Sequence, residues 1–290
     1  MAIIDEIFSN LTNPDLWIRL AFASVMVIVL ICLSIWKNTK LEKKIIWSFS
    51  RGLVQIVLLG SILLLIFGID QLWLLYSILF FMCIFAAYTN YKSYPYPKIF
   101  RINLIGITFS SMLIMTFVIF SGAIPNFNGI IYQASNSQST LGSFIIPIGS
   151  MTIFFAMRET GLTLERAKSD ILKSRGVIEA ALSLGASPDR AIKNISRDAF
   201  RVSMVPTLNR IAVLGVVNIP GLMSGMIVGG ASPIAAAIYQ VVIFMMLMCA
   251  AFISSIICSQ LFTNQFFTSN EQLNLEFFYK VSNLEKERKN

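Results

Sequence analysis

The chain has 290 residues, of which 56% are hydrophobic and 13% charged, and its mean hydropathy is +0.73. These values differ strongly from those of a soluble globular domain and indicate an integral membrane protein. The formal net charge of +8 suits a cytoplasmic surface that faces anionic lipid, so nucleic-acid binding is an unnecessary explanation.

Seven apolar stretches are candidates for membrane helices, because about 20 apolar residues cross the roughly 30 Å hydrocarbon core of a bilayer. They cover residues 16–36, 45–67, 72–87, 99–120, 141–157, 202–217 and 234–262. The stretches are continuous and do not alternate in polarity, which predicts helices and not a barrel. We therefore expect an all-α, polytopic membrane helix bundle with about seven transmembrane helices.

The distribution of Lys and Arg predicts the orientation, since these residues accumulate in cytoplasmic loops. Of the 23 basic residues, 21 lie in the C-terminal tail or in the segments that join the first stretch to the second, the third to the fourth and the fifth to the sixth, with Arg51 and Arg101 counted at the starts of the second and fourth stretches. Acidic residues such as Asp5, Glu6 and Asp70 mark the other side. The N-terminus is therefore predicted outside and the C-terminus inside. The acidic start also argues against a cleaved secretory signal.

The domain organisation expected from this pattern is one transmembrane domain over residues 1–265, followed by a cytoplasmic tail over residues 266–290. Within the tail, residues 283–290 are rich in charge and are predicted to be disordered. A cytoplasmic segment over residues 158–201 interrupts the transmembrane domain between its fifth and sixth helices.

The cytoplasmic segment carries apolar residues at helical spacing from Leu164 to Leu182, which predicts an amphipathic helix. Gly185 suits the left-handed position that closes a helix, Ser187 suits an N-cap, and Pro188 suits the first turn of a second helix. The second helix is expected to run into the sixth apolar stretch and to stop or bend at Pro206.

Glu179, Ala180 and Ala181 are followed after three residues by Gly185. In a cytoplasmic loop of a multi-helix membrane protein, this pattern resembles the coupling motif of ABC transporter permeases. Small alanines permit a close approach to a groove on an ATPase, Glu179 can pair with a basic residue there, and Gly185 supplies the turn. The alternative is an ordinary surface loop with a capped helix.

The rest of the chain is similar to the FetB-like family of iron-export ABC permeases and to the permease half of plant aluminium-tolerance transporters. The matching residues are 206–209, 215–225, Gly229, Pro233, Ala236, Tyr239, Gln240 and, upstream, Arg51, Gln55, 58–60, 146–147 and 164–166. The chain departs from the family where Gly-Asn-Ser-Met-Asn is replaced by residues 154–158, and where a polar Gln is replaced by Met226.

The resemblance implies a permease subunit in the plasma membrane that exports iron or another metal and is powered by a separate ATPase docked on the loop from Glu179 to Gly185. This chain has no P-loop, so ATP and Mg would be bound by the partner, and the chain itself would bind no cofactor and would not be an enzyme. The family also implies a homodimer of the permease with two ATPases.

A transport pathway is predicted along residues 218–233, where prolines and glycines cannot form one continuous helix, because irregular backbone inside a membrane is tolerated where it lines a cavity. Close helix packing at Gly225 and Gly229 is the alternative. The candidate pathway residues are Arg51, Gln55, Asn209, Asn218, Pro220, Gly221, Met223, Gly225 and Gln240. For each polar one, an interhelical hydrogen bond is the simpler interpretation.

No metal site is predicted, since the chain has no histidine, its four cysteines lack metal-ligand spacing, and methionines commonly fill apolar helices. Three other functions stay open. They are an ABC permease for nucleotide sugars or other small solutes, an ATPase-independent secondary transporter, and a membrane scaffold. Asp and Glu are absent from the centres of all seven stretches, which disfavours coupling to protons or sodium.

Overall fold

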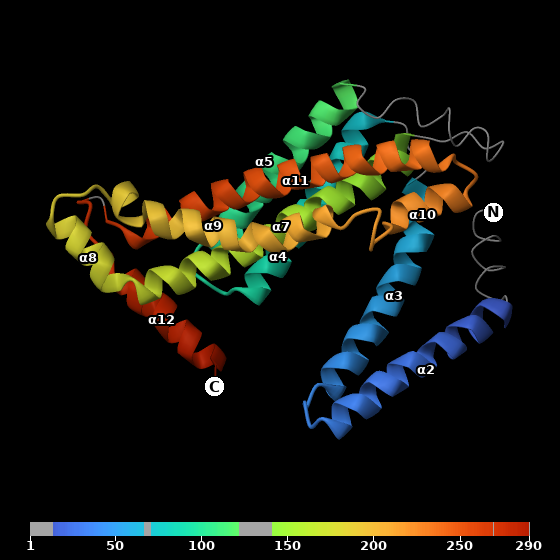
Figure 1. The fold of residues 1–290 in the computed structure, drawn as a ribbon, viewed down its shortest axis with the longest axis horizontal. Helices are drawn as coiled ribbons and strands as arrows, with labels where there is room; N and C mark the ends of the chain where they lie inside the picture. Colours follow the sequence, from blue (N-terminus) through green and yellow to red (C-terminus); the bar gives the residue numbers. More distant parts are fainter. Residues whose placement is uncertain (1–13, 67–70, 122–140, 269, 290) are drawn as a thin grey trace. The chain divides into compact units, whose positions relative to one another are not determined.

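The computed structural model (Figure 1) describes residues 14–66, 71–121, 141–268 and 270–289. Over these residues the elements are helices joined by turns, and the β-type pairing is limited to two isolated bridges, Leu214 with Asn218 and Phe267 with Leu273. The helical class predicted from the sequence is confirmed. The chain forms two compact units, Met1–Asp70 and Gln71–Asn290, which are described separately.

The first unit is a pair of helices, α2 (Pro14–Trp36) and α3 (Glu42–Ile66). Ser34 donates a hydrogen bond of 2.9 Å to the Glu42 carboxylate across the turn between them, and the Ser34 and Thr39 hydroxyls lie 2.6 Å apart. The turn is tight, because Asn38 and Lys40 both have positive φ, at 55° and 56°.

The core of the second unit consists of α4 (Leu72–Ser93), α5 (Ile99–Ser121), α7 (Leu141–Lys173) and α11 (Pro233–Thr263). α11 packs most extensively against α7 and α5, and α4 packs against both α5 and α7. Small residues permit this packing, since Ala250 and Ala251 of α11 are buried and Gly106 of α5 faces Cys258 and Ser254 of α11. Close backbone approach at small residues is the usual basis of helix packing in membranes.

Within the described parts of the chain, four helices are long and apolar enough to cross a membrane, and they are Glu42–Leu63, Leu72–Ser93, Ile99–Ser121 and Pro233–Phe266. Ala21–Trp36 is a shorter apolar helix. The predicted fifth stretch, 141–157, is the first half of α7, which continues without interruption to Lys173. The total of seven membrane helices and their orientation remain predictions.

The predicted sixth stretch, 202–217, differs from expectation. It is helical as far as Ala212, as the second half of α9 (Pro188–Ala212), and residues 213–220 leave the helix. Pro206 does not stop α9. Gly215, at φ +79°, closes a turn by donating a hydrogen bond of 3.0 Å to the Asn218 carbonyl, so the helix ends at the glycine-containing turn and not at the proline.

The C-terminal tail also corrects a prediction, since α12 (Leu275–Lys289) is helical through most of the segment expected to be disordered. Phe278 and Val281 are buried in a cluster with Ile171, Ile178 and Phe266. Burial of an amphipathic face stabilises a short helix that its own propensity would leave marginal. Disorder was predicted from the charge of residues 283–290, whereas the buried residues Phe278 and Val281 lie just before them in the same helix.

Candidate coupling surface and membrane-embedded polar residues

The turn at Gly185 closes α8 (Arg175–Ser183) with a Schellman motif. Gly185 has φ +82°, its N–H donates to the Leu182 carbonyl, and the Ala186 N–H donates to the Ala181 carbonyl, both at 3.0 Å. Ser187 is then the N-cap residue of α9, with Pro188 in the first turn. Two helices meet about Gly185 as predicted, but the single helix expected from Leu164 to Leu182 is divided at Ser174 into the end of α7 and α8. The docking role of the turn stays a prediction.

The α8 helix has two apolar faces. Ile178 is fully buried in the cluster that includes α12, and Leu182 packs against the same cluster. On the other side, Val177 and Leu184 are 69% and 88% exposed, and Ala180, which lies between them at helical spacing, is also exposed. We call Val177, Ala180 and Leu184 the outer face of α8. An apolar face of this kind outside the apolar helices is typical of a contact surface.

Glu179 is paired within its own chain. Its carboxylate accepts a hydrogen bond of 2.8 Å from the Arg175 Nε, one helical turn earlier. The same guanidinium donates to the Tyr279 hydroxyl at 2.9 Å and lies over the rings of Phe278 and Tyr279, about 5.4 Å and 5.3 Å from their centroids. Arg175 therefore holds the C-terminal helix α12 against α8.

We expect Arg175→Ala to loosen α12 from α8, because it removes the hydrogen bond to Tyr279 and both cation–π contacts at once. Hydrogen exchange of the α12 amides should become at least several-fold faster. Arg175→Lys keeps the charge but lacks the planar fork, so it should rescue the protection only in part. Unchanged exchange in Arg175→Ala would show that burial of Phe278 and Val281 alone holds the helix.

A seam of buried polar side chains lies where α7 meets α9 and α11. Glu159 is fully buried, and one of its carboxylate oxygens accepts a hydrogen bond of 2.6 Å from the Thr207 hydroxyl and lies 3.7 Å from the Arg158 Nη2. Two further pairs of hydroxyl groups are hydrogen-bonded at 2.8 Å, Thr163 with Ser203 and Thr160 with Ser254. Two of these contacts connect α7 to α9, and a third, between Thr160 and Ser254, connects α7 to α11.

A second buried charge, that of Lys168, lies on α7 nearer to α8. The Lys168 ammonium donates hydrogen bonds of 2.9 Å to the Tyr96 hydroxyl and to the Glu165 carboxylate. Burial disfavours the charged form, but the hydrogen bonds to Tyr96 and Glu165 outweigh it and raise the pKa of Lys168. Lys168 is therefore charged at neutral pH, and it ties α7 to the turn between α4 and α5.

The predicted broken segment is present. A short helix, α10 (Gly221–Val228), is separated from α9 by a turn and from α11 by a second turn in which Gly230 has φ +95°. Among the pathway candidates, Met223 and Gln240 come together, since the Met223 N–H donates to the Gln240 side-chain oxygen at 3.2 Å. Asn209, Asn218 and Gly225 are exposed within this unit.

The remaining candidates divide between the two units. Pro220 and Gly221 begin α10, as its N-cap and first residue. Arg51 and Gln55 lie on α3 in the first unit, with exposed side chains. The pathway assignment of all these residues stays a prediction.

Gln240→Leu should destabilise the α10 segment, because the Met223 N–H would lose its acceptor inside the helix bundle. An unsatisfied buried donor costs about 1–3 kcal/mol; because Met223 is only partly buried, we expect a loss of stability near the lower end, about 1 kcal/mol. Thermal unfolding in detergent measures it. Gln240→Glu preserves an acceptor at the same position and is the matched control when all three proteins are compared at an acidic pH that keeps the carboxyl group neutral; a loss as large as that of Gln240→Leu would then contradict the capping role.

Glu159, Lys168 and Arg175 were not predicted to be organising residues. A usable signal was present, since Glu159 and Thr163 are spaced by one helical turn on α7, and so are Ser203 and Thr207 on α9. Among the residues that the structure describes, no group of three or more His, Cys, Asp or Glu side chains could hold a metal ion.

Helices of membrane length, a broken apolar segment and the capped turn at Gly185 together define an all-helical integral membrane protein. The chain belongs to the family described as "Uncharacterised protein family (UPF0014)", which matches residues 17–267.

Relatives match nearly the whole chain. It is 32% identical to "Probable iron export permease protein FetB" of Escherichia coli over 265 residues, which are 91% of this chain and 95% of the relative. It is 31% identical to "UPF0014 membrane protein YjkA" of Bacillus subtilis over 259 residues, 88% of this chain and 97% of the relative. It is 29% identical to "Protein ALUMINUM SENSITIVE 3" of Arabidopsis thaliana over 262 residues, 90% and 91% of the two chains.

No solved structure matches the chain. The resemblance to the FetB-like family and to the plant proteins is confirmed by these relatives. The Escherichia coli relative is named as a permease and the Bacillus subtilis relative as a membrane protein.

Proposed function

We propose that this chain is the permease subunit of an ABC transporter, and that the turn from Glu179 to Gly185 docks on a separate ATPase that binds ATP and Mg. The observation that carries the proposal is the outer face of α8, where Val177 and Leu184 are exposed on either side of Ala180. A nine-residue helix that already buries Ile178 has no structural need for a second apolar face. A protein groove that covers this face would account for it.

The geometry of the segment favours transmission of a movement. α8 is connected through the rigid turn at Gly185 to α9, and α9 continues into the apolar part of the bundle, where Ser203 and Thr207 contact α7. Displacement of the turn by an ATPase would act on α9 as a lever. Movement of packed helices about such contacts is a common form of conformational switching.

The substrate that we propose is iron or another metal, exported across the plasma membrane, since a bacterial relative is named for iron export. The proposed assembly is a homodimer of the permease with two ATPases, in which the pathway lies between the permeases. The N-terminus would lie outside and the basic loops inside.

Inverted membrane vesicles that contain the chain and its ATPase test this proposal. We expect accumulation of iron that requires ATP and is unaffected by a proton uncoupler. Accumulation that persists without ATP and collapses with the uncoupler would identify a secondary transporter. ATP-dependent accumulation of a nucleotide sugar, but of no metal, would retain the ABC assignment and overturn the substrate.

A further inference from the structure

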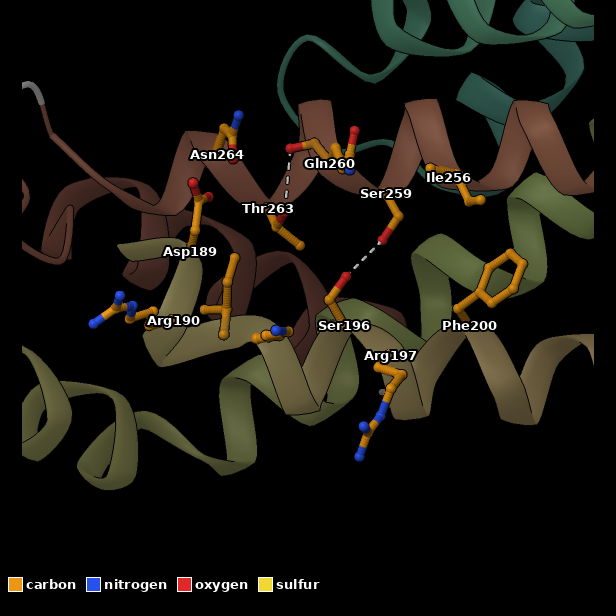
Figure 2. Close-up of a pocket in the computed structure, with 12 residues that line it drawn as sticks. Asp189, Arg190, Ser196, Arg197, Phe200, Ile256, Ser259, Gln260, Thr263 and Asn264 are labelled. Carbon is orange, nitrogen blue, oxygen red and sulfur yellow. Dashed lines mark hydrogen bonds between the residues drawn. The ribbon is translucent and has the colours of Figure 1, made fainter. Parts of the chain in front are cut away.

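A groove between α9 and α11 has no role in the proposed coupling. Its volume is about 710 Å³, and it is lined by the first three turns of α9 and the last turns of α11. In Figure 2, Ser196 and Ser259 point toward each other across its floor, where their hydroxyls lie 3.4 Å apart. Asp189 and Asn264 lie at one end of the groove, and Phe200 and Ile256 at the other.

The chemistry of the groove changes along its length. Phe200 and Ile256 make one end apolar, whereas the middle and the other end carry hydroxyl and amide groups of Ser196, Ser259 and Gln260. A ligand that fits this gradient is amphipathic, with an apolar part at Phe200 and a polar part that accepts hydrogen bonds from hydroxyl and amide groups.

The charge of the groove indicates the chemistry of the ligand's polar part. Arg190, Lys193 and Arg197 belong to its lining, against the single acid Asp189. Arg190 and Arg197 are exposed and extend outward from α9, with Arg197 drawn on the side away from Ser259 (Figure 2). Among the described ion pairs, Arg190 and Lys193 take part in none, and Arg197 has only a 3.9 Å contact with the largely exposed Asp198. An anionic group is therefore the complementary partner.

The position of the groove places it at the depth of lipid headgroups. α11 has 31 residues and is about 46 Å long, which exceeds the roughly 30 Å hydrocarbon core. The charged residues Arg190, Lys193 and Arg197 of α9 lie beside its last turns, which favours projection of α11 at its C-terminal end. The groove extends from Ile256 to Asn264, about 12 Å along the helix. This length covers the headgroup layer, which is roughly 5–8 Å thick on each side.

From these observations we propose that the α9–α11 groove binds an anionic phospholipid. The phosphate lies over the hydroxyl groups of Ser196 and Ser259 within reach of Arg190, Lys193 and Arg197, and an acyl chain passes Phe200 and Ile256 toward the hydrocarbon. Basic pockets between helices at the cytoplasmic membrane surface bind anionic headgroups in this manner. The proposal requires a membrane location and does not depend on an ATPase or on transport.

The test is native mass spectrometry of the full chain with phosphatidylglycerol or phosphatidylcholine added in detergent. The chain should retain phosphatidylglycerol in preference to phosphatidylcholine. Each basic residue near a headgroup contributes about fivefold in affinity, so the triple variant Arg190→Gln, Lys193→Gln, Arg197→Gln should lose retention roughly 100-fold. The matched control is Lys37→Gln, Lys43→Gln, Lys44→Gln, which changes the same charge in another exposed basic segment and should bind normally.

A second variant separates a built site from general attraction. Gln260 is exposed on the groove side of α11, and Gln260→Trp fills the groove without changing the charge, so retention should fall at least tenfold. Equal losses in the lysine control, or full retention in Gln260→Trp, would overturn the proposal. So would competition by millimolar inorganic phosphate as effective as that by the lipid, because it would indicate a free-phosphate site.

Discussion

Gly185→Asp should reduce ATP-driven accumulation in vesicles at least tenfold while the protein still inserts and folds. At φ +82° a residue with a Cβ is strained, at a cost of about 1–2 kcal/mol, so the Schellman turn would rearrange. The space around the Gly185 Cα is open, with no atom within 4 Å of an added Cβ. The effect should therefore come from the backbone and from the new charge on the docking surface, and not from overlap with the core.

Gly185→Asn is the matched control, because Asn tolerates the left-handed conformation better than other residues with a side chain. It should retain most of the transport activity. Transport in Gly185→Asp at the native level, or equal loss in both variants together with loss of thermal stability, would contradict a specific role of this turn in coupling.

Gly106→Leu should produce the largest loss of stability of any single substitution proposed for the helix core. A Cβ at this position would overlap the Cys258 Sγ and lie 3.3 Å from the Ser254 carbonyl oxygen of α11. The Cys258 thiol also donates to the Ile102 carbonyl at 3.4 Å, so α11 cannot move away without loss of that contact. Overpacking of this kind costs about 3 kcal/mol.

Thermal unfolding in detergent measures the effect. Ile105→Leu, on the adjacent exposed position of α5, keeps the apolar character and is the control that should unfold at the native temperature. An unchanged midpoint in Gly106→Leu would show that α5 and α11 do not pack as closely as described.

Patterns that depend on neighbouring residues were predictable from the sequence. The Gly185 turn, the Pro188 start of α9 and the break between Asn218 and Pro233 follow from the conformational limits of glycine and proline. Most apolar stretches were found because membrane helices are defined by length and composition. A proline in a helix interior ordinarily kinks or ends the helix. Of the two outcomes expected at Pro206, the stop is wrong, because α9 continues through the proline to Ala212.

Contacts between distant residues could not be predicted in the same way. Arg175 and Tyr279 are 104 residues apart, and Glu159 and Thr207 are 48 residues apart. A single sequence does not indicate which basic residue contacts which tyrosine or carboxylate. Glu179 was therefore predicted to pair with a basic residue of a partner protein, although Arg175 of the same chain already binds it. The packing of α12 was not predicted for the same reason, because its apolar residues are buried by contact with Ile178 and Phe266, which lie far away in the sequence.

The most direct test of the central claim is a mild-detergent pull-down of the full chain from its native membrane, with mass spectrometry of the proteins that accompany it. The same experiment should be run with Gly185→Asp and with Leu184→Glu, which places a charge on the outer face of α8. We predict that a P-loop ATPase accompanies the native chain and is lost with both variants. Absence of any ATPase from the native sample, or equal recovery with all three proteins, would contradict the assignment of this chain as an ABC permease that docks its ATPase through α8.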